Sequence, residues 1–231
     1  MTEFMKLSMC DLGRAIEVGD LDPIDITQVY LDTAETHSMA PRIYARLTKD
    51  RALAEAEAAS TRAKLGSRRG LLDGVPVSWK DLFDTAGTAT EAGSALLKGR
   101  VPTKDAEMVR RASACGLVGL GKTHMSELAF SGLGLNPITA TSPCINDVDA
   151  VSGGSSSGAA ASVAFEIAPG AIGTDTGGSV RIPAAWNDLV GLKTTAKRLP
   201  LTGIVPLAAS FDTVGPLVKS VEDAAHVFAA L

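Results

Sequence analysis

The stretch that decides the fold is residues 152–186, SGGSSSGAAASVAFEIAPGAIGTDTGGSVRIPAAW. It holds two serine-bearing glycine turns, at 153–158 and 177–179, and an apolar segment between them, at 159–172. Glycine adopts backbone conformations that other residues resist, and it lets backbone N–H groups approach a ligand closely. The pattern therefore predicts two turns that present serine hydroxyls beside backbone donors, with buried structure connecting them.

A flexible Gly/Ser linker is the alternative for GGSSSG taken alone. The residues that follow, 159–165 (AAASVAF), predict a buried helix that begins directly after the glycine turn. Linkers do not continue into a hydrophobic core. The stretch is therefore interpreted as part of a packed domain.

Composition is that of an ordinary globular protein, with 231 residues, 45% of them hydrophobic and 21% charged. The net charge of −4 argues against a direct nucleic-acid partner. The three cysteines, Cys10, Cys115 and Cys144, form no paired motif, which is typical of a reducing cytosol. We find no signal-peptide pattern and no apolar run of transmembrane length, so we expect a cytoplasmic protein without a membrane partner.

Helices and strands alternate along the chain. Residues 1–64 are expected to be helical, with one helix starting at Asp22-Pro23 and another over residues 50–64. The other expected elements are helices at 103–114, 159–165 and 221–231, and short strands at 74–79, 117–120, 171–173 and 189–193. This alternation predicts an α/β layer structure, whose strand order stays open.

Residues 116–123, GLVGLGKT, match the phosphate-loop pattern G-x-x-x-x-G-K-[ST]. That pattern requires a strand before the loop and a helix after it. Here a helix is expected before the match, and the loop residues themselves form an apolar strand. We therefore interpret the match as accidental.

Two kinds of serine chemistry are compatible with the glycine turns. Ser156 is at the centre of a G-x-S-x-G pattern, but residues 146–151 make a poor preceding strand, and His226 is the only later histidine. A lysine held neutral by burial can replace a histidine as the base. Lys80, at the end of the strand at 74–79, is the candidate, although pairing with Asp81 or Asp84 is the simpler explanation for that lysine alone.

Five segments together resemble the amidase signature family. They are residues 74–87 (GVPVSWKDLFDTAG), the loop around Ser155, residues 173–186 (GTDTGGSVRIPAAW), residues 189–195 (LVGLKTT) and residues 211–216 (FDTVGP). The family works with a Ser–cis-Ser–Lys triad. The resemblance implies Lys80 as the base, Ser155 as the bridging serine after a cis peptide bond from Gly154, and Ser179 as the nucleophile.

The resemblance also implies roles around the triad. Asp175 and Arg181 are expected to support the nucleophile turn, and Ser156 the serine loop. Residues expected to hold the oxyanion through their backbone N–H groups, or to contact substrate, are Thr176, Gly177, Gly178, Ser179 and Phe130. No metal or cofactor is implied, because the family needs none and the three histidines are scattered.

The fold implied by the resemblance is an α/β structure with a mixed β-sheet core covered by helices, incomplete at the C-terminus. We expect residues 1–66 to form an N-terminal helical region packed on the core, and residues 67–231 to form the N-terminal half of the α/β domain. The signature loop departs from the family pattern at Ser157 and Ala159.

The function implied by the resemblance is hydrolysis of a small amide through an acyl-enzyme, in a protein compatible with a homodimer. One alternative is an amidotransferase A-type glutaminase, which supplies ammonia for tRNA-dependent amidation beside B- and C-type subunits. The altered signature loop favours the amidase. A further alternative is an inactive truncated fragment.

Overall fold

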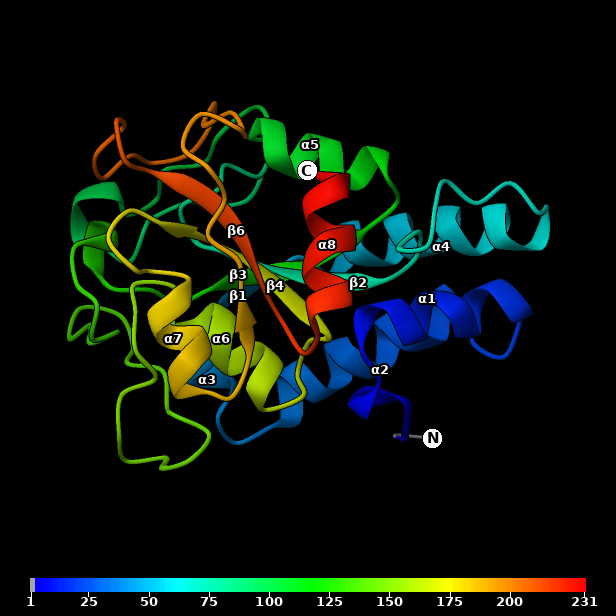
Figure 1. Ribbon diagram of the computed structural model, residues 1–231, viewed down its shortest axis with the longest axis horizontal. Helices are drawn as coiled ribbons and strands as arrows, with labels where there is room; N and C mark the ends of the chain where they lie inside the picture. The colour runs from blue at the N-terminus through cyan, green and yellow to red at the C-terminus, as the bar shows by residue number, and fades with distance from the viewer. Residues whose placement is uncertain (1–2) are drawn as a thin grey trace.

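The structure is a computed structural model that describes residues 3–231 (Figure 1). The core of the protein is a mixed β-sheet. Its six strands lie in the order β1-β3-β2-β4-β6-β5. They are β1 (Tyr44–Leu47), β2 (Pro76–Lys80), β3 (Val118–Thr123), β4 (Gly170–Asp175), β5 (Val190–Gly191) and β6 (Thr213–Val218). β2 runs parallel to β3 and β4, whereas the other neighbours pair antiparallel. The expected mixed α/β architecture is confirmed.

Helices cover both faces of this sheet. They are α1 (Met9–Val18), α2 (Pro23–Thr36), α3 (Ala40–Ile43), α4 (Lys49–Lys64), α5 (Glu107–Ala114), α6 (Ser157–Ala164), α7 (Arg181–Trp186) and α8 (Val221–Ala230), with single 3-10 turns at η1 (Glu3–Lys6), η2 (Ala95–Leu97) and η3 (Glu127–Ala129). In residues 3–231 no helix has the length and apolar character needed to cross a membrane.

Alternating residues of the strands divide the core between the two faces. Ile172 of β4 and Val218 of β6 belong to the larger hydrophobic cluster, with side chains of α1, α2, α4, α5 and α8. Their neighbours Ala171 and Leu217 point the other way, against α6 and α7. Every residue of β4 and β6 is buried, so these strands lie in the middle of the layers.

Several helix ends follow the signals in the sequence. The Asp22 carboxylate accepts a hydrogen bond from Ile24 N, with Pro23 in the first turn, and Ser220 Oγ accepts one from Asp223 N. Both predicted helix starts are confirmed. The helix expected from residue 103 begins only at Glu107.

The expectation that residues 1–64 are helical throughout is wrong at β1. Tyr44–Leu47 pairs antiparallel with β3, as an edge strand of the sheet. The close approach depends on Gly121, where an added Cβ would lie 2.5 Å from the backbone oxygen of Arg46. This strand has four residues between two helices, too few to show a strand periodicity.

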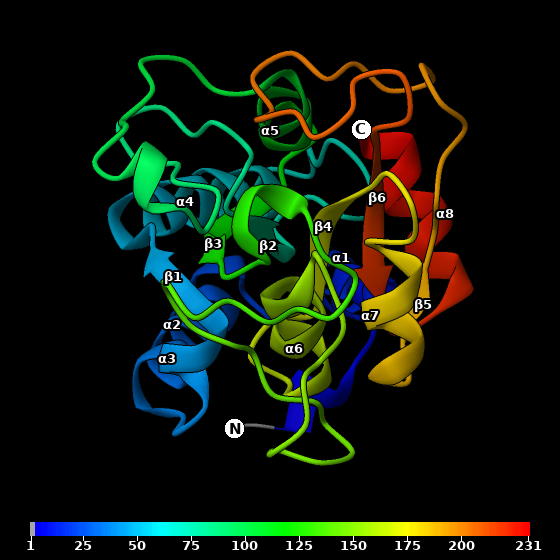
Figure 2. The same cartoon turned by 90° about the vertical axis from the view of Figure 1, so that its left-hand side faces the viewer.

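The second half of the sheet also differs from the expectation. β5 is limited to Val190–Gly191, whereas residues 189–193 were expected, and β6 had no predicted counterpart. β6 contains Gly215 and Pro216, two residues that argue against a central strand in a sequence. Residues 131–153 form the expected loop. Figure 2 shows it passing over α6, where an added Cβ on Gly134 would meet Ser157 Cβ at 3.0 Å.

Candidate active site

The site begins where two parallel strands end. β2 and β4 are neighbours, so their carboxyl ends lie at the same edge of the sheet, where α/β proteins commonly place their functional groups. Lys80 is the last residue of β2, and Thr174 is near the end of β4. Lys80 Nζ donates to Thr174 Oγ1 over 2.9 Å. Thr174 was not singled out from the sequence, although its position in the GTDTGGS motif is a usable signal.

The serine loop brings Ser155 to the same lysine. Lys80 Nζ donates to Ser155 Oγ over 2.7 Å, and the peptide bond between Gly154 and Ser155 is cis. The loop is held from the other side, because Gly154 N donates to the backbone oxygen of Gly132 and Ser126 N donates to that of Ser155. The expected contact between Lys80 and the serine loop is therefore present.

Burial changes the protonation equilibrium of Lys80. Neither Lys80 nor Ser155 exposes any surface to solvent. Removal from water disfavours the charged ammonium, and this lowers the pKa of Lys80 to about 7, against the opposing charges of Asp175 and Asp212. At neutral pH a large share of Lys80 side chains is uncharged.

The turn that carries Ser179 is built on the Asp175 carboxylate. This buried group accepts hydrogen bonds from Gly178 N at 2.9 Å and from Val180 N at 3.1 Å, and it pairs with the Arg181 guanidinium. Burial opposes ionisation, but Arg181 and the backbone donors outweigh it and lower the pKa of the Asp175 carboxyl. Asp175 and Arg181 thus support the turn, as expected.

Ser156 joins the two serine turns. Its backbone N donates to the backbone oxygen of Ser179 over 3.2 Å, and its Oγ donates to the backbone oxygen of Thr174 over 3.2 Å. Ser179 is 8% exposed, whereas Ser155 and Ser156 are fully buried. Within residues 3–231 no hydrogen bond joins Ser179 Oγ to Ser155 Oγ. Of these three serines, only Ser179, the candidate nucleophile, exposes some of its surface to solvent.

Backbone donors surround Ser179. Among the described residues, the N–H groups of Thr176, Gly177 and Ser179 have no protein acceptor. Gly178 was expected to contribute as well, but its N–H already donates to Asp175. An added Cβ at Gly177 would meet nothing within 4 Å, which leaves that side of the turn open.

Asp212 connects this turn to the loop before β6. Its carboxylate accepts hydrogen bonds from Thr176 Oγ1 at 2.5 Å, from Leu207 N at 3.0 Å and from Ala208 N at 3.1 Å. The carboxylate therefore fixes both the side chain of an expected oxyanion residue and the course of residues 207–212. The FDTVGP motif marked Asp212 in the sequence, but no role could be assigned to it there.

Phe130 borders an open hollow rather than the buried lysine. It is 82% exposed, and it lines a hollow of about 520 Å³ with Leu128, Leu135, Pro137 and Leu207. Leu207, whose backbone N–H donates to the Asp212 carboxylate, thus forms part of the wall of this hollow. Phe130 directly precedes the loop at residues 131–153, which leads to the serine turn at 153–158, and it therefore lies at the edge of the site.

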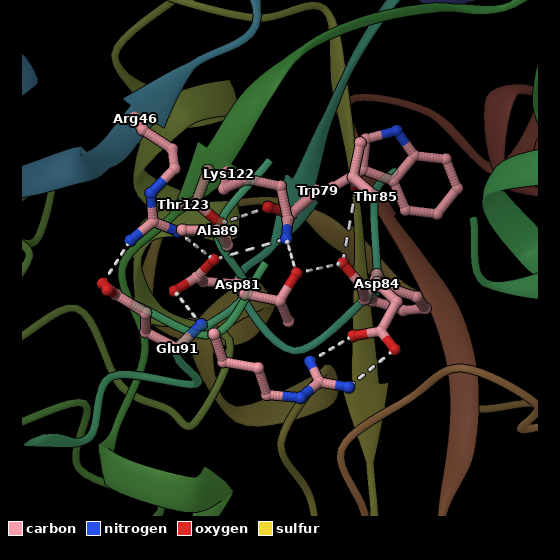
Figure 3. Close-up of polar contacts among 12 residues, drawn as sticks. Arg46, Trp79, Asp81, Asp84, Thr85, Ala89, Glu91, Lys122 and Thr123 are labelled. Atoms are coloured by element: carbon pink, nitrogen blue, oxygen red, sulfur yellow. Dashed lines mark hydrogen bonds and ion pairs between the residues drawn. The ribbon is translucent and has the colours of Figure 1, made fainter. Parts of the chain in front are cut away.

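A separate polar cluster accounts for the carboxylates beside Lys80 (Figure 3). Asp81 pairs with Arg46 and lies 3.3 Å from Lys122 Nζ, while Asp84 pairs with Arg100. Lys80 therefore forms no ion pair with Asp81 or Asp84, which removes the simpler explanation for this lysine. Lys122 is a buried residue of β3, so the phosphate-loop match is a strand, as expected.

Within residues 3–231, no hydrogen bond joins a histidine side chain to the serine turns. His124 is mostly buried, and its environment lowers the pKa of its imidazole to about 4, chiefly through burial. Its backbone N and O bond to Ile43 and Gly158. His226 lies on α8 beside Cys10 and Glu222. The arrangement around Ser156 thus gives no support to a histidine triad.

Comparison with known proteins agrees with this geometry. Residues 25–231 match the family described as Amidase. The A-type subunit of glutamyl-tRNA(Gln) amidotransferase is 41% identical in Anaeromyxobacter dehalogenans (strain 2CP-C), covering 97% of this chain and 46% of the relative, and 42% identical in Thermobifida fusca (strain YX), covering 97% and 45%. The solved peptide amidase of Stenotrophomonas maltophilia matches with a TM-score of 0.93 and 38% identity, covering 100% of this chain and 49% of that one.

The chain spans about half the length of these relatives. The alignments themselves cover 97% of this chain in the sequence comparison and 100% of it in the structural comparison. The matched span includes the motifs on which the resemblance in the sequence was based, from the strand that ends at Lys80 to the turn that carries Ser179. The chain belongs to the amidase family.

Proposed function

We propose that this chain carries the catalytic machinery of an amidase, with Lys80, Ser155 and Ser179 as its catalytic residues. The observation that supports this most is the contact of 2.7 Å between Lys80 Nζ and Ser155 Oγ in a site closed to solvent. A lysine with a pKa of about 7 is a competent general base at neutral pH.

In the proposed reaction Ser179 Oγ attacks the carbonyl carbon of an amide. Its proton moves to Ser155 Oγ, whose own proton moves to neutral Lys80. The tetrahedral intermediate then collapses, the C–N bond breaks, and the leaving nitrogen takes the proton back through Ser155. The products of this half-reaction are an amine or ammonia and an ester on Ser179, which water hydrolyses by the same relay.

The oxyanion of the intermediate would be held by the backbone N–H groups of Thr176, Gly177 and Ser179. Donors that are fixed before the reaction stabilise developing charge without reorganisation, and one such donor is worth about 3 kcal/mol. The Asp175 carboxylate and its bonds to Gly178 and Val180 support this role, because they hold the turn from its opposite side.

A glutaminase role within an amidotransferase is the second candidate. It is favoured by the 41% identity to the A-type subunit of a glutamyl-tRNA(Gln) amidotransferase. The same relay would then release ammonia from glutamine for a partner protein. Turnover of simple amides by the isolated chain favours the amidase, and turnover only in the presence of B- and C-type subunits favours the amidotransferase.

A fluorophosphonate probe tests the proposed nucleophile. We expect one adduct, mapped by mass spectrometry to Ser179, which is absent in Ser179→Ala and strongly reduced in Lys80→Met. Ser67→Ala, in an exposed turn away from the site, provides the control and should label normally. Labelling at Ser156 in place of Ser179, or no labelling of a chain with a cooperative melting transition, would contradict the proposal.

A further inference from the structure

Two helices, α1 and α8, meet at a cluster of potential metal ligands. α8 packs beside α1 (Figure 1). There, Cys10 Sγ, a carboxylate oxygen of Glu222 and an imidazole nitrogen of His226 all lie within 4.8 Å of one another. Glu222 and His226 are four residues apart on one helix, so they share a face. The cysteine is fully buried on the opposing helix, and the other two side chains are exposed.

A second observation concerns the buried carboxylate of Asp223. This residue has no exposed surface, and its Oδ1 accepts a hydrogen bond from Cys10 N over 2.8 Å. Its Oδ2 has no hydrogen-bond partner among residues 3–231. An unpartnered buried oxygen of this kind is costly, and a cation bound beside Cys10 would reduce that cost.

We propose that Cys10, Glu222 and His226 form a Zn²⁺ site that joins α1 to α8, with the buried Asp223 carboxylate beside Cys10. A thiolate, an imidazole and a carboxylate oxygen are ligands that zinc prefers, and a water molecule would complete its tetrahedral geometry. The ligands come from α1 and α8, so the pattern C-x-x-C is not needed to assemble them.

Arg14 is the competitor for this site. Its guanidinium pairs with Glu222 and with Asp11, and about half of each side chain is exposed. Exposed ion pairs of this kind contribute little free energy, so Arg14 does not hold Glu222 away from a divalent cation. Removal of Arg14 should free the carboxylate. We therefore expect Arg14→Gln to bind the metal more tightly than the native chain.

Cobalt substitution tests the site directly. The chain, purified with a chelator and a reductant, is titrated with Co²⁺, and the expected result is one equivalent bound with a thiolate-to-cobalt charge-transfer band and the intense visible bands of a tetrahedral ion. Zn²⁺ should displace the cobalt. His226→Ala should weaken the zinc affinity by at least about tenfold, because even the partners of metal ligands cost this much.

Matched variants decide which residues hold the ion. Cys10→Ser should abolish the charge-transfer band, whereas Cys115→Ser and His37→Ala should retain both the band and the affinity. Cys10 is buried and its substitution can disturb folding, so the exposed residues Glu222 and His226 provide the independent test. Absence of the band in the native chain, or cobalt binding that His226→Ala and Glu222→Gln leave unchanged, would overturn the proposal.

Zinc should also stabilise the fold. An ion that binds only the folded state adds RT ln(1 + [Zn²⁺]/Kd) to the free energy of unfolding, about 2.7 kcal/mol at one hundred times Kd. The melting temperature should therefore rise with Zn²⁺ in the native chain and in Ser179→Ala, but not in His226→Ala. No rise in the native chain would count against the site. The readout does not depend on catalysis.

Discussion

Burial lowers the pKa of Lys80 to about 7, which suits the role of base that we propose for it. Its amine is enclosed between a serine loop and the end of β4, where its two hydrogen-bond partners are the hydroxyls of Ser155 and Thr174. Hydroxyls stabilise an ammonium less than carboxylates do, so the loss of hydration is the largest effect on the pKa of Lys80 and lowers it. The nearest carboxylates, Asp175 and Asp212, are both engaged by other donors.

The proposed base predicts a pH dependence for Ser179. The rate of fluorophosphonate labelling should rise about tenfold per pH unit while Lys80 is mostly protonated, and it should level off above a pH of about 7. Asp212→Asn should move this limb to lower pH, because the Asp212 charge raises the pKa of Lys80. The measurement is a labelling rate between pH 5 and 9, and a profile that is flat across this range would refute the base.

The Asp175 carboxylate predicts an acid-dependent contribution to stability. Asp175→Asn should lower the free energy of unfolding by about 2 kcal/mol at neutral pH, since it weakens hydrogen bonds to a buried charge. The folded-state pKa is lowered, so this contribution is complete above about pH 4 and is lost as the pH falls through the folded value. Urea titrations of both chains should show a gap that closes in acid; a gap independent of pH would contradict the assignment.

The main site residues could be found in the sequence because each lies in a contiguous motif. Residue type and local pattern marked Lys80, at the end of an apolar strand, and the serines of the two glycine turns as candidates, and the resemblance to a family selected Ser155 and Ser179 among those serines. Thr174 and Asp212 were missed because their roles depend on neighbours far along the chain. Thr174 meets Lys80 across 94 residues, and Asp212 meets Thr176 across 36.

At the scale of elements, the contact between β1 and β3 gives a sharp test. Gly121→Ala would place a Cβ 2.5 Å from the Arg46 carbonyl oxygen and 2.9 Å from Leu47 Cα, both of them backbone atoms that cannot rotate away. We expect a loss of about 1–3 kcal/mol in unfolding free energy, as for other overpacked sites. Chemical denaturation provides the measurement.

Gly119 is the matched control in the same strand. An added Cβ there would lie 3.6 Å from its nearest neighbours, which is an ordinary contact. Gly119→Ala should therefore change stability by no more than about 0.5 kcal/mol. Equal losses at both glycines would mean that the strand resists any substitution, and the argument from the approach of β1 would fail.

Elements with strong local signals were predictable, and short or interrupted ones were not. The helix after Asp22-Pro23 and the buried strand before Lys80 each show length, periodicity and a boundary residue. β1 has four residues and β6 contains a Gly-Pro pair, so neither shows the alternation of a strand. Their place in the sheet is decided by tertiary contacts. The strand order likewise depends on pairings between distant segments, such as β4 with β6.

At the scale of the whole molecule, the first third of the chain belongs to the same core as the rest. Leu12 and Ile26 lie in one hydrophobic cluster with Trp79 and Ile172 of the central strands. β1 extends the sheet itself, and α1 contacts α8 through the bond from Cys10 N to the Asp223 carboxylate. These contacts cross the boundary at residue 66 that the sequence suggested between an N-terminal region and the α/β domain.

We therefore predict that the chain unfolds as one cooperative unit. Calorimetry should give a single transition with a van't Hoff enthalpy close to the calorimetric enthalpy. A fragment of residues 67–231 should lack a cooperative melt, because removal of α1, α2 and α4 exposes the buried faces of β2 and β4. Two resolved transitions, or a fragment with the near-ultraviolet circular dichroism of a packed core, would instead make residues 1–66 a separate unit. Either result would decide the domain boundary, because a common core cannot melt in parts.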